Sequence, residues 1–218
     1  MEKNIHQIWV GPYEMPDREK RYVQKMKESN PGWQHFLWTD ENLPELPEEI
    51  RIRCQLFRSQ KDYAHIADVI RIFLVHKFGG IYLDVDFQPI GNLDDSGISE
   101  RDGVFFYHGG DDYTMPNGCF GLSVGTEMGA HLLSQISHKF GGWYGPSWMG
   151  GEVKKFLNME YESDHDLVDK KLGDFNIKYM TFHDLERNYC THRALYSWSP
   201  ENKRNFESGN INYLEDHE

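Results

Sequence analysis

The stretch that most constrains the fold is residues 63–86, YAHIADVIRIFLVHKFGGIYLDVD. Apolar side chains recur in its first part at helical spacing, so we predict an amphipathic helix. Gly79 and Gly80 are expected to end that helix, because glycine enters a left-handed cap without steric cost. The β-branched and aromatic run at 81–87 then predicts a short strand, which Pro89 closes. The apolar arc of the helix comprises Tyr63, Ile66, Val69, Ile70, Phe73 and Leu74.

Two pairs of charged residues lie within this unit. Asp68 and Arg71, three residues apart, are expected on one helix face, and Asp84 and Asp86 on one face of the strand. Two carboxylates about 4 Å apart repel by roughly 4 kcal/mol at an effective dielectric of about 20. A hard divalent cation such as Mn²⁺ or Mg²⁺ would relieve that repulsion, since it takes oxygen ligands and leaves positions open for substrate phosphates. The alternatives are solvated aspartates at a strand end and an exposed ion pair worth about 0.3–0.5 kcal/mol.

The motifs of this unit resemble a known enzyme family. DVIR at 68–71, followed by FGGIYLDVD at 78–86, resembles the sugar-binding region of the family 32 glycosyltransferases. These include capsular-polysaccharide and yeast mannosyltransferase-type enzymes, and the glucosylating clostridial toxins carry a related region. IHQIWVG at 5–11 and NPGWQHFLW at 30–38 resemble the first and second strands of the family. The similarity covers roughly residues 4–92 well and the remainder in patches.

The resemblance implies a metal-dependent, retaining transfer of a hexose from a nucleotide-diphosphate sugar. A UDP-sugar is favoured as donor, a GDP-sugar is possible, and the acceptor would be the hydroxyl of a glycan or another molecule. Asp86, assisted by Asp84, would hold Mn²⁺ or Mg²⁺ and so neutralise charge on the departing diphosphate. Asp68 and Arg71 would orient the sugar, and a planar guanidinium suits that contact better than an ammonium.

Further candidates for nucleotide and sugar contacts lie on both sides of this unit. Trp9 could stack on a nucleobase, worth about 1–3 kcal/mol, but a core or lid tryptophan is an equal alternative. Val10 follows Trp9 in the same motif, and Tyr82 is expected on the face of Asp84. Asn117 is a candidate for a sugar contact. Glu41 and Asn42 could touch a ribose, although a solvated turn is favoured, and a packed histidine is favoured for His65.

The C-terminal part of the chain carries the last predicted site residues. In CTHRALYSW at 190–198, which resembles the family's segment near the end of the catalytic domain, His192 could complete the metal sphere. Ser197 and Trp198 are expected on a flap that excludes water near the diphosphate. GGWYGPSWMGG at 141–151 suits either an acceptor surface or a structural aromatic turn.

The order of predicted elements indicates an α/β fold of the GT-A-like kind, with a mainly parallel sheet flanked by helices. Ligands bind such sheets beyond the carboxyl ends of the strands. We expect one domain over residues 1–218, with a nucleotide-sugar half at 1–92 and an acceptor-side half and flap at 103–200. Strands are predicted at 4–10, 33–38, 103–107, 117–124 and 175–182, helices at 17–29, 48–59, 127–140 and 152–158, and a loop at 160–174.

The bulk composition excludes several partner classes. A formal charge of −12 argues against nucleic acid and against a polybasic membrane anchor. Three widely separated cysteines are no disulfide framework, which favours a reducing compartment. No apolar run has the length of a signal peptide or a membrane span, so a soluble, cytoplasmic protein is expected.

Two rival functions follow from the same acidic residues. A glycoside hydrolase needs two carboxyl groups about 5–9.5 Å apart that flank the scissile bond, whereas Asp84 and Asp86 are expected side by side. A catalytically inactive module that binds a nucleotide sugar or a carbohydrate is the second rival. Metal-dependent release of free nucleotide diphosphate would discriminate the transferase from both.

Overall fold

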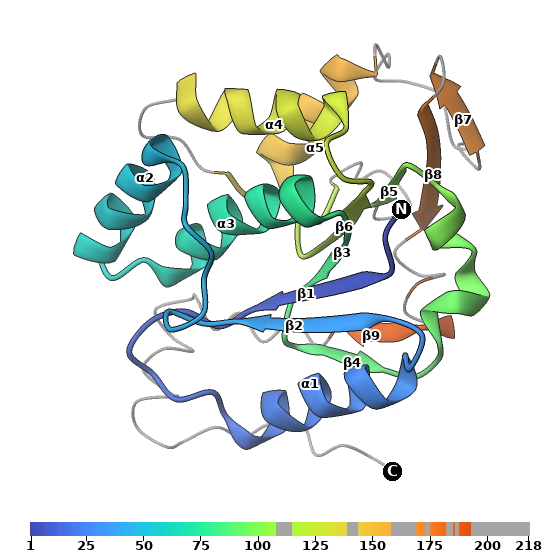
Figure 1. Cartoon of the computed structure of the whole chain (residues 1–218), viewed down its shortest axis with the longest axis horizontal. Helices are drawn as coiled ribbons and strands as arrows, with labels where there is room; N and C mark the ends of the chain where they lie inside the picture. The colour runs from blue at the N-terminus through green and yellow to red at the C-terminus, as the bar shows by residue number, and fades with distance from the viewer. Residues whose placement is uncertain are drawn as a thin grey trace.

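The computed structural model shows an α/β fold built around one central sheet (Figure 1). It describes residues 1–107, 115–138, 144–157, 169–172, 175–181, 185 and 188–192. Within that part of the chain the sheet has seven strands in the order β2-β1-β3-β6-β5-β8-β7. Five of them, β1, β2, β3, β5 and β8, run in one direction, and β6 and β7 run in the other. The predicted fold class is confirmed.

The bounds of the elements agree with most of the predicted ranges. The strands are β1 (Asn4–Ile8), β2 (Gln34–Trp38), β3 (Gly80–Leu83), β4 (Phe87–Pro89), β5 (Gly103–Tyr107), β6 (Cys119–Leu122), β7 (Asp169–Leu172), β8 (Phe175–Thr181) and β9 (Cys190–His192). The helices are α1 (Asp17–Ser29), α2 (Glu48–Ser59), α3 (Tyr63–Phe78), α4 (Glu127–His138) and α5 (Pro146–Phe156), with short 3-10 helices at Leu93–Ser96 and Ile98–Glu100. No helix of the described residues combines the length and the apolar composition that a membrane crossing requires.

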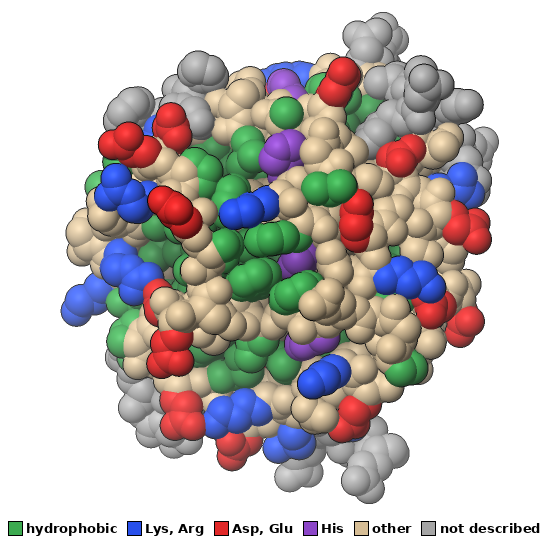
Figure 2. All heavy atoms as spheres, in the orientation of Figure 1, with side chains coloured by type: hydrophobic (Ala, Val, Ile, Leu, Met, Phe, Trp, Pro, Cys, Tyr) green, Lys and Arg blue, Asp and Glu red, His purple; other side chains and the backbone are tan. Residues whose placement is uncertain are grey.

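The two faces of the sheet are covered differently. Helices α2 to α5 lie on one face, and α1 with the small β4–β9 sheet lies on the other (Figure 1). Successive side chains of a strand point to opposite faces of the sheet, so each strand contributes to the hydrophobic core on both faces. Tyr82 packs on the α3 side, whereas Ile81 and Leu83 pack on the α1 side. Figure 2 shows hydrophobic side chains gathered between α3 and the β1–β2 edge, with charged side chains mostly around them.

The connection from α3 to β3 is fixed by contacts with β1. Gly79 and Gly80 adopt positive φ angles of 64° and 106°, which confirms the predicted glycine stop. The Nδ2 of Asn4 donates to the carbonyl of Phe78 at 2.9 Å. The indole N–H of Trp38 donates to Nδ1 of His6 on β1 at 3.1 Å. The ring proton of His6 is therefore on Nε2, which donates to the carbonyl of Gly79 at 2.8 Å.

Several predictions about these elements were wrong. The strand ends at Leu83, so Asp84 follows it and Asp86 lies in a turn rather than on the same strand face. The chain turns there because the amide of Phe87 bonds to the carbonyl of Asp84 at 3.2 Å. The first strand ends at Ile8, and residues 69–75 of α3 are all buried, Arg71 among them, so this part of the helix is not amphipathic.

Two further differences concern the C-terminal half. Helix α5 begins at Pro146, within the segment for which a turn was an alternative, because Trp148, Met149 and Val153 all bury their side chains. Proline at the first helical position favours that start. Strand β7 lies inside the predicted loop at 160–174, because it pairs with β8 as an antiparallel neighbour.

Candidate active site

The centre of the site is the guanidinium of Arg71, which α3 directs towards the end of β3. Its Nη2 lies 3.0 Å from Oδ1 of Asp68 and 3.4 Å from Oδ1 of Asp84. Its Nη1 donates to the carbonyl of Asn117 at 2.7 Å, and its Nε donates to the carbonyl of Ala67 at 3.2 Å. The structure therefore brings together Asp68, Arg71 and Asp84, which the sequence placed on two separate elements.

Tyr82 connects the end of β3 with the same guanidinium. Its ring lies beneath Arg71, with the guanidinium carbon 4.5 Å from the ring centre, a cation–π geometry. Its hydroxyl donates to Oδ1 of Asp84 at 2.6 Å. Tyr82 and Asp84 thus lie on one side of the sheet, as predicted, and one carboxylate oxygen of Asp84 is held by both neighbours.

Asn117 closes the site from the turn that precedes β6, the strand beside β3. Its Nδ2 donates to Oδ1 of Asp68 at 2.8 Å and to the carbonyl of Tyr144 at 3.2 Å. The Tyr144 ring packs edge to face against Trp148 with ring centres 5.2 Å apart. Asn117 therefore places the aromatic start of α5 beside the carboxylate that is predicted to orient the sugar.

The site opens to solvent at Asp84. Side-chain exposure rises from 6% at Arg71 to 13% at Asp68 and 31% at Asp84. Gly118 lies against the other oxygen of Asp84, Oδ2, and a Cβ at that position would collide with it. The amide of Asp84 also donates to the carbonyl of Gly118 at 2.8 Å. A ligand that enters from solvent therefore meets Asp84 before the buried Arg71.

Burial and charge set the protonation states here. Burial raises the pKa of Asp68, and the neighbouring Arg71 opposes that shift. Burial alone would lower the pKa of Arg71, but Asp84, Tyr82 and Asp68 together raise it, so the guanidinium stays charged. Burial raises the pKa of Tyr82 well above 10, so its hydroxyl keeps the proton that it donates to Asp84.

The donor set at the end of β3 suits a hard cation. Asp84 and Asp86 supply carboxylate oxygens, the ligands that Mn²⁺ and Mg²⁺ take. Strand β9 brings the backbone of His192 opposite Phe87, the residue after Asp86. The side chain of His192 lies outside the described residues, and within the described part no three His, Cys, Asp or Glu side chains form a metal-binding group.

The nucleoside side is predicted where β1 ends. Trp9 and Val10 follow that strand directly, and the indole N–H of Trp9 donates to the carbonyl of Tyr13 at 2.8 Å. A Cβ at Gly11, whose φ is 115°, would lie 2.8 Å from the ring of Tyr63, the first residue of α3. The proposed base site and the helix that carries Asp68 are therefore in direct contact. Stacking of a base on Trp9 stays a prediction.

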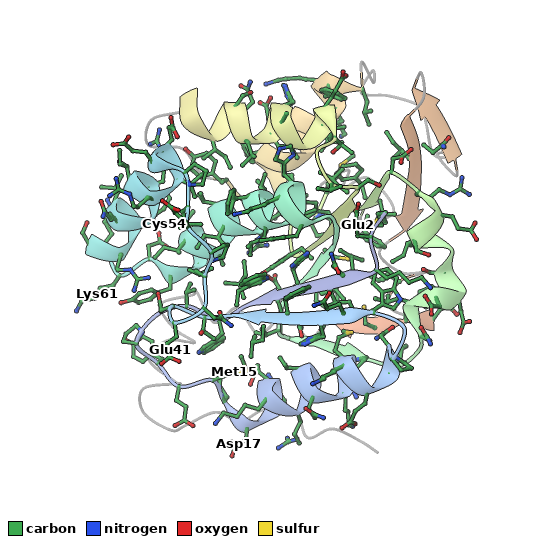
Figure 3. All side chains as sticks on the ribbon, in the orientation of Figure 1. Glu2, Met15, Asp17, Glu41, Cys54 and Lys61 are labelled. Carbon is green, nitrogen blue, oxygen red and sulfur yellow. The ribbon has the colours of Figure 1, made fainter. Side chains whose placement is uncertain are left out.

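Residues around this edge have structural contacts of their own. Figure 3 labels Glu41 in the loop after β2 and Lys61 in the turn before α3, both near the edge where β1 and β2 end. The side chain of Asn42 holds its own turn, accepting from the amide of Thr39 at 2.6 Å, which supports a turn role. His65 packs on Phe57 with ring centres 5.2 Å apart, as expected of a packed histidine.

Some site residues were not predicted from the sequence, and some predictions cannot be placed. Gln7 and Gly118 both contact Asp84, and only the pairing of β1 and β6 with β3 shows this. Ser197 and Trp198 lie outside the described residues, as do positions 141–143 of the aromatic segment.

Known proteins show the same region and the same fold. Residues 16–102 match the family described as the glycosyltransferase sugar-binding region containing the DXD motif. The chain is 36% identical over 138 residues to inositol phosphoceramide mannosyltransferase 3 of Schizosaccharomyces pombe, covering 62% of this chain and 35% of that protein. It is 27% identical over 110 residues to the subversion of eukaryotic traffic protein A of Legionella pneumophila, covering 39% and 17%. The chain thus spans only about a third of the first of these proteins and less of the second.

A solved structure supports the fold independently. The PaToxG glycosyltransferase superposes with a TM-score of 0.61 at 14% identity, covering 72% of this chain and 69% of that one. At this level of identity the likeness concerns the fold. Over residues 16–102 the sequence is therefore similar to glycosyltransferases that carry the DXD-containing sugar-binding region, and the fold is similar to that of a solved glycosyltransferase.

Proposed function

We propose that this protein is a metal-dependent, retaining glycosyltransferase that moves a hexose from a nucleotide-diphosphate sugar to a hydroxyl acceptor. A UDP-sugar is the favoured donor, and a glycan hydroxyl is the favoured acceptor. One observation carries the proposal: a single buried guanidinium, Arg71, contacts both Asp68 and Asp84. That contact joins a sugar-orienting carboxylate to the acidic turn, residues 84–87 at the end of β3, where a diphosphate would be held.

The proposed contacts with the nucleoside, the sugar and the acceptor lie along one end of the sheet. Trp9 and Val10 face the nucleoside where β1 ends, Asp68 accepts hydrogen bonds from sugar hydroxyls, and Arg71 fixes the carboxylate of Asp68. Holding the sugar in one orientation converts an intermolecular encounter into an aligned one, which lowers the entropic part of the barrier. The acceptor would approach past Tyr144 and Trp148, beside Asn117.

Asp86, Asp84 and His192 are the proposed metal ligands. A bound Mn²⁺ or Mg²⁺ would supply charge stabilisation for the departing diphosphate. The protein's own part is to orient the carboxylate of Asp84. Tyr82 donates to Oδ1, and Gly118 leaves room for Oδ2. Ser197 and Trp198 are proposed to cover the diphosphate.

The proposal is tested by turnover. The purified protein is incubated with UDP- and GDP-hexoses with and without Mn²⁺, and release of the nucleoside diphosphate is measured. Asp86→Ala is expected to lower turnover at least about 100-fold, within the range seen when a charge-stabilising group is removed. Asp95→Ala removes an exposed carboxylate away from the site and serves as the matched control. Equal turnover in Asp86→Ala and wild type would remove the metal assignment.

A second measurement separates the transferase from an inactive binding module. A module would bind the nucleotide sugar in the presence of Mn²⁺ but would release no free nucleoside diphosphate at any acceptor concentration. Calorimetric titration of the donor, run beside the turnover assay, therefore distinguishes binding without chemistry from catalysis.

A further inference from the structure

Gln7 is a buried polar residue whose side-chain amide makes a hydrogen bond through each of its two polar atoms, and one of these bonds reaches the site. It lies on β1 with no exposed surface. Its Nε2 donates to the backbone carbonyl of Asp84 at 3.2 Å, and its Oε1 lies 2.8 Å from Nε2 of His35 on β2. Three neighbouring strands, β2, β1 and β3, are thus connected by one side-chain relay that ends at the acidic turn.

The chemistry of the partners fixes the direction of this relay. A backbone carbonyl only accepts, so the amide nitrogen of Gln7 must face Asp84 and its oxygen must face His35. His35 therefore carries its proton on Nε2 and donates it to Gln7. The pairing of β1 with β2 places Gln7 opposite Leu37, so His35 reaches it diagonally from two residues away along the neighbouring strand.

The contact holds the backbone of Asp84 from a second side. The amide of Asp84 donates to the carbonyl of Gly118 on the β6 side, and its carbonyl accepts from Gln7 on the β1 side. The same carbonyl accepts from the amide of Phe87 at 3.2 Å, which closes the turn that contains Asp86. Both carboxylates of the DXD motif therefore depend on where this one peptide group lies.

We infer that Gln7, oriented by His35, is a positioning residue that holds the acidic turn in the conformation that binds metal and diphosphate. The inference rests on the proposed function, because it assigns Asp84 and Asp86 to the metal. Gln7 itself touches no reacting atom, and its effect passes through the backbone of Asp84. Loss of groups that hold the ligands of a metal typically costs about 10–100-fold in metal affinity or activity.

The test compares Gln7→Met with a matched variant, Asn30→Leu. Asn30 is also a buried amide that donates to a backbone carbonyl, that of Met26 at 2.9 Å, but it lies away from the site. Both changes remove a side-chain donor from a backbone carbonyl, so both are expected to lower thermal stability. His35→Leu, at a partly exposed position, is the milder variant that removes only the orienting partner.

Two readouts are measured for each protein. The first is hydrogen exchange of the peptide that contains Asp84 in the metal-free protein, at a temperature well below unfolding. We expect Gln7→Met to exchange at least about tenfold faster there, as a locally opened segment does, with His35→Leu in between and Asn30→Leu unchanged. The second is the Mn²⁺ concentration for half-maximal turnover, expected to rise at least about tenfold in Gln7→Met, less in His35→Leu and not in Asn30→Leu.

The outcomes separate the inference from the proposed function. If Gln7→Met and Asn30→Leu exchange alike at Asp84, or share the wild-type Mn²⁺ requirement, Gln7 is only a packing residue and the inference is overturned. If the wild type shows no Mn²⁺-dependent turnover, the proposed function fails by itself. The exchange measurement then still decides whether Gln7 holds the turn.

Discussion

At the scale of single residues, Arg71 is the group on which the geometry of the site depends most. A buried guanidinium is tolerated because it contacts two carboxylates and two backbone carbonyls at once. Lysine would keep the charge but would present a single ammonium in place of a planar fork. The spacing in DVIR indicated the partnership with Asp68, because residues three apart share a helix face. The partnership with Asp84 depends on the packing of α3 on β3, which no local pattern encodes.

We therefore predict that Arg71→Lys lowers turnover about 10–100-fold. The loss of one charge-assisted hydrogen bond is worth about 1.5–3 kcal/mol, and about 1.4 kcal/mol is a factor of ten. Steady-state release of the nucleoside diphosphate measures it. Arg51→Lys, at a half-exposed position on α2, is the control and should retain wild-type turnover. A fully active Arg71→Lys would show that the fork geometry is unimportant.

A second prediction at this scale concerns Gly118. Its backbone shows no positive φ, so alanine there is not strained by conformation, and the added Cβ collides only with the carboxylate of Asp84. Gly118→Ala should therefore lower Mn²⁺-dependent turnover at least about tenfold while the protein still folds. Gly151→Ala is the control, because nothing lies within 4 Å of the added atom. Similar activity in the two variants would contradict a ligand role for Asp84.

At the scale of elements, the α3–β3 connection could be predicted from sequence because its signals are local. Helical periodicity, two glycines and a β-branched run are all within 25 residues, and α1 and α2 have the predicted bounds for the same reason. The strand end could not be predicted, because the contacts of Asp84 come from segments distant in sequence, namely the side chain of Gln7 on β1 and the carbonyl of Gly118 before β6. Strand β7 was missed likewise, since the polar residues Asp169–Leu172 form a strand only beside β8.

The same connection gives a third prediction, on stability. A Cβ at Gly80 would collide with the carbonyl of Asn4, and φ is 106°, a conformation that alanine adopts only under strain. Gly80→Ala should lower the free energy of unfolding by at least about 1–3 kcal/mol. Urea unfolding measures the change, with Gly151→Ala again as a reference that lies inside a helix. An unchanged urea midpoint would mean that β1 can move away from residue 80 without a loss of stability.

At the scale of the whole molecule, the buried histidine on β1 connects stability to pH. Burial lowers the pKa of His6 to about 4 from an ordinary 6.5. The unfolded chain then binds more protons between those values, so stability is present above about pH 6.5 and is lost as the pH falls towards 4. Each unit of pKa difference is worth about 1.4 kcal/mol, which makes the full loss about 3 kcal/mol.

We predict that the free energy of unfolding falls between pH 7 and pH 4.5 and that His6→Met flattens this dependence. The variant should be less stable at pH 7, because Trp38 and Gly79 lose their partner. Burial also lowers the pKa of His35, which acts in the same direction, whereas the raised pKa of Asp68 acts in the opposite one. Urea unfolding at several pH values compares the slopes, and parallel slopes in the two proteins would exclude His6 as the cause.

The shared guanidinium has a kinetic consequence. Asp68, Asp84 and Asp86 bring three negative charges to the end of the sheet, and Arg71 offsets one, so two remain. A naked pyrophosphate would be repelled by that surplus, while a divalent ion cancels it. We therefore expect ordered binding, in which the ion binds first or together with the donor. A donor from which a chelator has removed the ion should not bind.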